Sequence, residues 1–193
     1  MKINVMSLFP EIIESSLKGL VGKAIDSKIA DLNLLDLKDF SQNQYGSVDD
    51  SPYGGGEGMV ISIEPLEACL NTIKKPGKII FLTPQGKIFD QNTAIELSSL
   101  KELTLVCGRY EGIDQRFIDS YVDEEISIGD YILSGGEIAA SVVIDAILRN
   151  KENVIGNQVS VENDSLSKGR LKGHIYTRPN EYKEKKVPEI LLS

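Results

Sequence analysis

The stretch SIGDYILSGGE, residues 127–137, combines three glycines with two acidic side chains. Glycine-rich turns between a strand and a helix often bind phosphate, because backbone N–H groups there point at the ligand. No Lys or Arg occurs from Glu124 through Leu148, however, and the chain contains neither G-x-x-x-x-G-K-[ST] nor G-x-G-x-x-G. The stretch therefore suits a ligand without phosphate that main-chain groups can bind and that tolerates negative charge.

Two further loops of similar character follow apolar runs. TPQGKIFDQ (83–91) comes after IIFL, and CGRYEGID (107–114) comes after LTLV. Because ligands of an open parallel sheet bind at the carboxyl ends of its strands, all three loops together predict one site, although a single such loop is ordinary turn chemistry. S-adenosylmethionine, with an adenosine, a sulfonium and an ammonium, fits these loops better than ATP or NAD.

The elements that must position these loops alternate along the chain. Apolar runs predict strands at 3–9, 32–37, 78–83, 103–107 and 125–128, and the segments between and after them predict helices at 10–18, 64–73, 90–99, 113–121 and 136–150. This alternation is typical of an α/β fold with a mostly parallel sheet and helices on both faces. The helix 136–150 is so apolar that the fold or a second subunit must cover most of its sides.

Composition indicates one globular domain with a short appendage and no membrane-spanning or signal segment. The chain has 193 residues, 41% of them apolar, two cysteines in apolar runs and one histidine. Buried thiols are therefore expected rather than a metal site, in a protein of the reducing cytoplasm. The net charge is −8, yet residues 149–193 carry +3. That basic end is either a docking surface for a polyanion or a solvated tail, and charge alone favours the tail.

Seven motifs occur together in the chain: PYGGGEGM, TPQGKIFDQ, CGRYEGID, DEEISIGDYILSGGE, NDS, YTRP and VPEILLS. In order and spacing they resemble the bacterial tRNA (guanine-N1)-methyltransferases of the TrmD type, within the SPOUT superfamily. The resemblance spans the whole chain. It implies a deep C-terminal trefoil knot, S-adenosylmethionine as methyl donor, dependence on Mg²⁺, and an obligate homodimer with shared active sites. The implied reaction is methylation of N1 of the guanine immediately 3′ of the anticodon in tRNA.

The resemblance also implies site residues. The catalytic candidates are Asp164, as the base that removes the N1 proton, and Arg149, as the cation near guanine O6. The implied cofactor site comprises Thr83, Pro84, Gln85, Gly108, Arg109, Tyr110, Glu111, Ile128, Gly129, Tyr131, Leu133, Gly135 and Gly136. The implied tRNA contacts are Tyr53, Gly54, Gly55, Gly56, Lys168 and Arg170. Glu111 is also a possible magnesium contact.

Each of these residues has a plainer interpretation. Asp164 could cap a short helix, Arg149 could pair with Asp145 one turn earlier, and Glu111 could be a solvated loop acid. The YGGGEG glycines could form a flexible linker, and the basic residues 168–172 could be solvated. The resemblance favours the functional interpretation for Asp164 and Arg149.

The resemblance divides the chain into three parts. Residues 1–155 form the methyltransferase domain with the cofactor-binding knot, residues 156–173 a flexible loop over the active site, and residues 174–193 the start of a C-terminal tRNA-binding region. The family continues into a helical domain that the sequence lacks, so we expect this chain to bind the cofactor as a dimer and to methylate tRNA poorly. Two other functions stay open: a SPOUT enzyme acting on ribose 2′-OH or rRNA, and a non-catalytic RNA-binding module.

Overall fold

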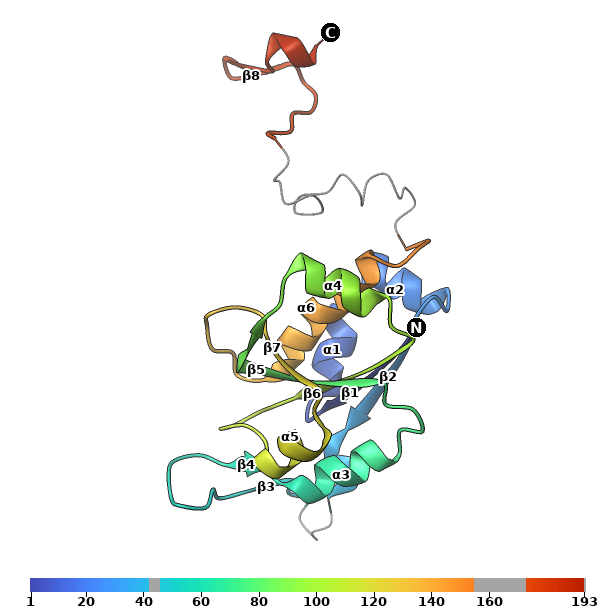
Figure 1. The fold of residues 1–193 in the computed structure, drawn as a ribbon. Coiled ribbons are helices and arrows are strands. Elements are labelled where there is room, and N and C mark those ends of the chain that lie inside the picture. Colours follow the sequence, from blue (N-terminus) through green and yellow to red (C-terminus); the bar gives the residue numbers. More distant parts are fainter. Residues whose placement is uncertain (42–45, 155–172, 193) are drawn as a thin grey trace.

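A computed structural model describes residues 1–41, 46–154 and 173–192. At its centre lies a parallel sheet of five strands in the order β2-β1-β6-β5-β7 (Figure 1). The strands are β1 (Lys2–Ser7), β2 (Asp31–Asp36), β5 (Lys78–Ile88), β6 (Glu102–Cys107) and β7 (Glu124–Ser127). Each of the five predicted strands is confirmed to within two residues at its start.

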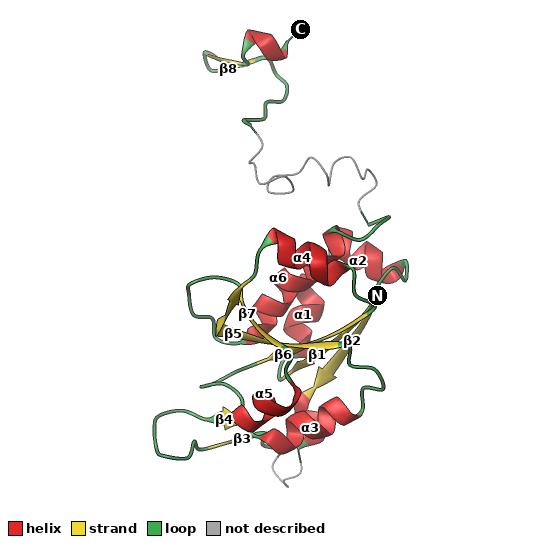
Figure 2. Cartoon of the chain, in the orientation of Figure 1, coloured by secondary structure: helices red, strands yellow, loops and turns green. Residues whose placement is uncertain are grey.

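Helices cover both faces of this sheet, as Figure 2 shows. One face carries α1 (Pro10–Ser16), α2 (Gly19–Asp26), α4 (Gln91–Ser98) and α6 (Gly136–Arg149). The other face carries α3 (Ile63–Asn71), α5 (Gln115–Tyr121) and the short 3₁₀ helix η1 (Leu37–Phe40). The predicted α/β fold with a parallel sheet between helices is therefore confirmed.

Strand side chains alternate between the two hydrophobic layers. In β5, Ile80 and Leu82 join the layer of α6, whereas Ile79 and Phe81 join the layer of α3. This period of two is why the central strands read as continuous apolar runs, since both faces of the sheet are buried. The sheet is thereby fixed between two helix layers, and the strand ends become a rigid base for the loops.

The starts of α4 and α5 follow the expected capping chemistry. The side chain of Asp90 accepts a hydrogen bond from the Thr93 N–H at 2.8 Å at the start of α4, which confirms the predicted cap, and this bond lowers the pKa of Asp90. Asp114 does the same for the Arg116 N–H at the start of α5, two residues later than predicted. The Arg116 side chain beside it lowers the pKa of Asp114.

Several elements were not predicted. Helix α2 was missed because Gly19 and Gly22 lower its helix propensity, although Val21 and Ala24 bury its inner side. Short strands β3 (Asp49–Asp50) and β4 (Val60–Ile61) pair across the glycine-rich segment expected to be a loop. The second predicted loop, 156–173, lies almost wholly outside the described residues.

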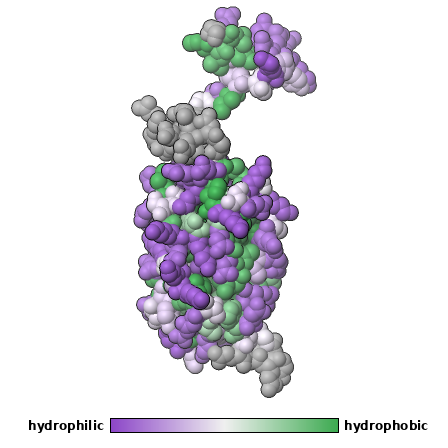
Figure 3. Space-filling view, turned by 90° about the vertical axis from the view of Figure 1, so that its right-hand side faces the viewer, coloured by the Kyte–Doolittle hydropathy of each residue, from purple (hydrophilic) through white to green (hydrophobic). Residues whose placement is uncertain are grey.

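The C-terminal described segment contains a small hairpin of β8 (Glu181–Tyr182) and β9 (Lys185–Lys186), followed by η2 (Glu189–Leu191). Figure 3 shows the face on the β2 side of the molecule, where hydrophilic residues surround small hydrophobic patches. Charged and polar side chains on an edge strand such as β2 discourage further strand pairing. In the ranges that the structure describes, no helix has the length and apolarity needed to cross a bilayer.

Candidate active site

The carboxyl ends of β5, β6 and β7 enclose a pocket of about 440 Å³. All three loops singled out in the sequence contribute to its wall. The predicted cofactor residues that line it are Thr83, Pro84, Gln85, Gly108, Tyr110, Glu111, Ile128, Gly129, Tyr131, Leu133, Gly135 and Gly136. The structure thus brings together every member of the predicted cofactor set except Arg109.

A bulge in β5 forms the first wall of the pocket. Leu82 and Lys87 both pair with Ile126 of β7, so the residues between them leave the ladder and bulge toward the pocket. Gly86 permits this close approach, because a Cβ at its position would collide with the main chain of β7. The bulge therefore carries residues 83–85 to the ligand side without breaking the sheet.

The loop after β6 rests on the glycine-rich segment 51–59. The main-chain N–H of Glu111 donates to the Met59 carbonyl at 3.0 Å. Gly58 has φ +86°, and a Cβ there would lie 2.6 Å from Cγ of Glu111. Both the backbone conformation and the space available therefore favour glycine at this position. Tyr53 and Gly54–Gly56, the other predicted substrate contacts in this segment, lie in an exposed turn outside the pocket lining.

The third loop ends where α6 begins, against the end of β6. The Gly136 N–H donates to the Gly108 carbonyl at 2.8 Å, and Arg109 forms an antiparallel bridge with Gly135. A Cβ on Gly136 would lie 2.8 Å from Cα of Cys107. Main chain therefore packs directly on main chain at this corner of the pocket.

The pocket lining carries almost no charge. Within the described part of the chain, Glu111 is the single charged residue that lines it, and the other polar groups belong to the main chain or to Ser, Thr, Gln and Tyr side chains. Phosphate sites normally add a Lys or an Arg to main-chain N–H groups, and this lining contains neither. This lining instead suits a ring system bound by main-chain groups beside a cationic centre.

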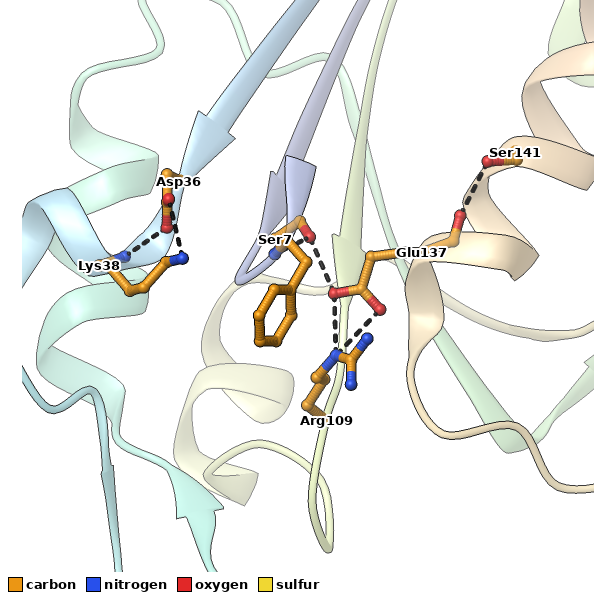
Figure 4. Close-up of polar contacts among 7 residues, drawn as sticks. Ser7, Asp36, Lys38, Arg109, Glu137 and Ser141 are labelled. Atoms are coloured by element: carbon orange, nitrogen blue, oxygen red, sulfur yellow. Dashed lines mark hydrogen bonds and ion pairs between the residues drawn. The ribbon is translucent and has the colours of Figure 1, made fainter. Parts of the chain in front are cut away.

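Arg109 does not line the pocket, although the resemblance implied a cofactor contact there. Its neighbours Gly108, Tyr110 and Glu111 line the pocket, whereas the Arg109 side chain points toward Glu137 and Phe9. Its Nε lies 3.2 Å from both carboxylate oxygens of Glu137, and its guanidinium carbon lies 4.3 Å from the Phe9 ring centroid (Figure 4).

The catalytic candidates lie apart from the pocket lining or outside the described residues. Arg149 lines a second groove of about 410 Å³ along α6, with Ser16 of α1 and Gln91 of α4 on its sides. Asp164, Lys168 and Arg170 fall within 155–172, outside the described residues. In the described part of the chain, Arg149 therefore does not belong to the pocket lining.

Neither cysteine offers a nucleophile or a metal ligand. Burial raises the pKa of Cys69 to about 12, and burial together with the nearby negative charge of Glu137 raises the pKa of Cys107 well above its usual range. Across residues 1–41, 46–154 and 173–192, no three His, Cys, Asp or Glu side chains gather as a metal site would require. The described residues therefore form no Mg²⁺ site built from protein ligands alone, and Glu111 would be a lone carboxylate ligand.

Sequence reasoning missed part of the lining. The additional residues are Phe81, Leu82, Gly112, Ile126, Ser127, Ile132, Ser134 and Ala139. Most of them lie beside predicted members, so adjacency in the three loops was the available signal. The role of Glu137 as partner of Arg109 had no sequence signal, because 28 residues separate the two.

Comparison with known proteins agrees with this geometry. Residues 1–193 match the family described as tRNA (Guanine-1)-methyltransferase TrmD. Proteins named tRNA (guanine-N(1)-)-methyltransferase from Treponema denticola, Pseudoalteromonas translucida and Geobacter sulfurreducens are 48%, 46% and 44% identical to it. These alignments cover 100%, 99% and 100% of this chain, and 80%, 77% and 80% of the relatives. The chain belongs to the tRNA (guanine-1)-methyltransferase TrmD family.

Proposed function

We propose that this protein transfers a methyl group from S-adenosylmethionine to N1 of the guanine immediately 3′ of the anticodon in tRNA. The observation that supports this most is the nearly uncharged, main-chain-lined pocket formed by the three strand ends. Family membership and the names of the relatives support the tRNA substrate and the position on the guanine ring. A tRNA substrate supports a location in the cytoplasm.

The residues present fit the methyl donor. A volume of about 440 Å³ lies in the range of pockets for small ligands. The glycines Gly108, Gly129, Gly135 and Gly136 line the pocket, so main chain rather than long side chains would face an adenine edge there. Glu111 tolerates the positive charge of the sulfonium and ammonium groups. When bound, S-adenosylmethionine supplies an electrophilic methyl group on a positively charged sulfur.

The protein's own residues would carry the proton and the charge. Guanine N1 bears a proton, so Asp164 would accept it while the N1 electron pair forms the new bond to the methyl carbon. The carbon–sulfur bond breaks in the same step and leaves a neutral thioether. Arg149 would lie near guanine O6, where negative charge develops as the proton leaves. No step is assigned to Mg²⁺.

The trefoil knot is part of this proposal. Its support is the path of the chain after β7, which crosses to the end of β6, where Arg109 bridges Gly135 and Gly108 accepts from the Gly136 N–H. Such a path is unusual, because deep threading is essentially absent from folds in general. In this protein it would fix three loops around one ligand.

A homodimer with shared active sites is supported by the groove on α6. Ile138 and Val142 lie on this helix one turn apart and are 48% and 44% exposed, which is unusual for neighbouring apolar side chains. Arg149 lines the same groove rather than the pocket of its own chain. A second copy seated there would cover the apolar pair and bring Arg149 toward the partner's pocket.

Replacing Val142 with glutamate is expected to shift the protein from dimer to monomer, because a buried unpaired charge at an interface is strongly unfavourable. Sedimentation velocity would measure the change, and methyl transfer should fall with the dimer fraction. Leu20→Glu, at a half-exposed leucine of α2, is the matched control. If the Val142→Glu protein remains dimeric, the groove on α6 is not the dimer interface.

The function itself is tested by methyl transfer to tRNA carrying guanine or adenine immediately 3′ of the anticodon. Methylation of the guanine tRNA alone, with 1-methylguanosine as the product, is the expected result. A product methylated on a ribose or elsewhere in RNA would indicate another SPOUT reaction. Binding of RNA without any transfer would indicate a non-catalytic module.

A further inference from the structure

Glu137 is a buried carboxylate whose partners come from two other parts of the sheet edge (Figure 4). It opens α6 and its side chain is 1% exposed. The Ser7 hydroxyl, at the end of β1, donates to its Oε1 at 2.9 Å, and Arg109 Nε meets both oxygens at 3.2 Å. A charge this buried persists in folded proteins when it is paired and hydrogen-bonded, as it is here.

The Arg109 side chain is held on more than one side. Phe9 covers the guanidinium face at 4.3 Å, and the Phe9 N–H donates to Ser7 Oγ at 3.0 Å. The end of β1 and the residues just after it therefore contact both partners of the ion pair. Arg109 reaches the carboxylate through Nε, which both carboxylate oxygens share. These contacts fix where the Arg109 side chain crosses the loop 129–135.

That crossing lies directly over Gly135. A Cβ on Gly135 would lie 2.5 Å from Oε2 of Glu137 and 2.7 Å from Nε of Arg109. The Glu137 carboxylate and the Arg109 side chain thus pack directly against Gly135. The main chain of Gly135 also forms a bridge with the main chain of Arg109. The ion pair and the bridge together clamp the carboxyl end of the loop that begins at Gly129.

Between its two ends, the described hydrogen bonds of this loop are local: the Tyr131 N–H donates to the Gly129 carbonyl at 3.0 Å, and the Tyr131 hydroxyl donates to the Ile128 carbonyl at 3.3 Å. Ile132 at its tip is 80% exposed and Tyr131 is 54% exposed. Its amino end is fixed by bonds between Ser127 Oγ and the main chain of Gly129 at 3.0 and 3.3 Å. The position of this pocket wall therefore depends on its two ends, and the clamp at Gly135 is one of them.

We propose that Glu137 is a positioning residue, whose buried carboxylate holds Arg109 across Gly135 and thereby keeps the loop 129–135 closed against the methyl-donor pocket. This inference rests on the proposed function. Glu137 touches neither donor nor guanine in this account, so its loss should weaken donor binding and leave the chemical step largely intact. A role confined to folding would lower thermal stability without changing the affinity of the folded protein.

The test is calorimetric titration of S-adenosylmethionine into Glu137→Gln, Arg109→Gln and the double variant, with melting temperatures and steady-state kinetics. Loss of a charged hydrogen bond predicts a Kd and a KM for the donor raised by about tenfold or more, with kcat within about twofold of the original. The matched control is Glu124→Gln, which breaks a half-buried pair with Lys78 at the amino ends of β7 and β5, away from the pocket, and should leave donor affinity unchanged.

The double variant covers the case in which a single variant does not fold, because it leaves no lone buried charge. Its melting temperature should recover toward that of the original protein while its Kd stays raised. Donor affinity within about twofold of the original in the folded variants would overturn the positioning role. Failure of the unaltered protein to bind the donor would instead overturn the proposed function.

Discussion

Replacing Asp164 with asparagine is expected to reduce methyl transfer to tRNA by about 10²- to 10⁴-fold, the usual contribution of a positioned general base. Asparagine has nearly the same size but cannot accept the N1 proton, so guanine N1 remains a poor nucleophile. Single-turnover transfer of a labelled methyl group, at saturating donor and tRNA, measures the chemical step alone. The Kd of S-adenosylmethionine should stay within about twofold of the original, because the role proposed for Asp164 is toward guanine N1 and not toward the donor.

Glu162→Gln is the matched control for Asp164→Asn, since it removes a carboxylate from the same segment of the chain. It should transfer methyl groups at close to the original rate. Equal losses in the two variants would mean that the segment needs negative charge in general rather than a base at position 164. Full methyl transfer by Asp164→Asn would show that Asp164 is not the base.

Replacing Gly136 with alanine is expected to weaken binding of S-adenosylmethionine by about tenfold or more. The added Cβ would lie 2.8 Å from Cα of Cys107 and 3.1 Å from the main-chain nitrogen of Gly108. Both are backbone atoms at the end of β6 and cannot rotate away, so the start of α6 must move and its N–H would leave the Gly108 carbonyl. Overpacking of this kind costs about 1–3 kcal/mol, or a melting temperature lower by about 3–10 °C.

Calorimetric titration and a thermal melt measure both effects of Gly136→Ala. Gly173→Ala is the matched control, because a Cβ at Gly173 would meet no atom within 4 Å. It should bind the donor as tightly as the original protein and melt at the same temperature. Unchanged donor affinity in Gly136→Ala would show that the close contact between α6 and β6 does not shape the ligand site.

Most of the fold could be predicted from the sequence, because the signals for strands and helix starts are local. Apolar runs predicted the five central strands, and Asp90 marked the start of α4. Helix α2 went undetected because two glycines mask a segment that tertiary packing stabilises through Val21 and Ala24. The register shift in β5 also went undetected, since nothing in TPQGK distinguishes a bulge from a strand that simply ends.

The candidate site could likewise be predicted only in part. Its main-chain lining follows from glycines at three strand ends, which can be seen in the sequence once a parallel sheet is assumed. The orientation of Arg109 cannot, because it depends on a carboxylate from α6 and an aromatic ring that follows β1. A resemblance to a family implied that Arg109 contacts the cofactor, whereas the structure places its side chain outside the pocket lining.

The central claim is that the three strand-end loops bind a cationic methyl donor through their main chain. It is tested most directly by calorimetric titration of the protein with S-adenosylmethionine, ATP and NAD under the same conditions. Saturable one-to-one binding of S-adenosylmethionine per chain, with no measurable heat from ATP or NAD, is the predicted result. Binding of ATP or NAD as tight as that of S-adenosylmethionine would contradict it.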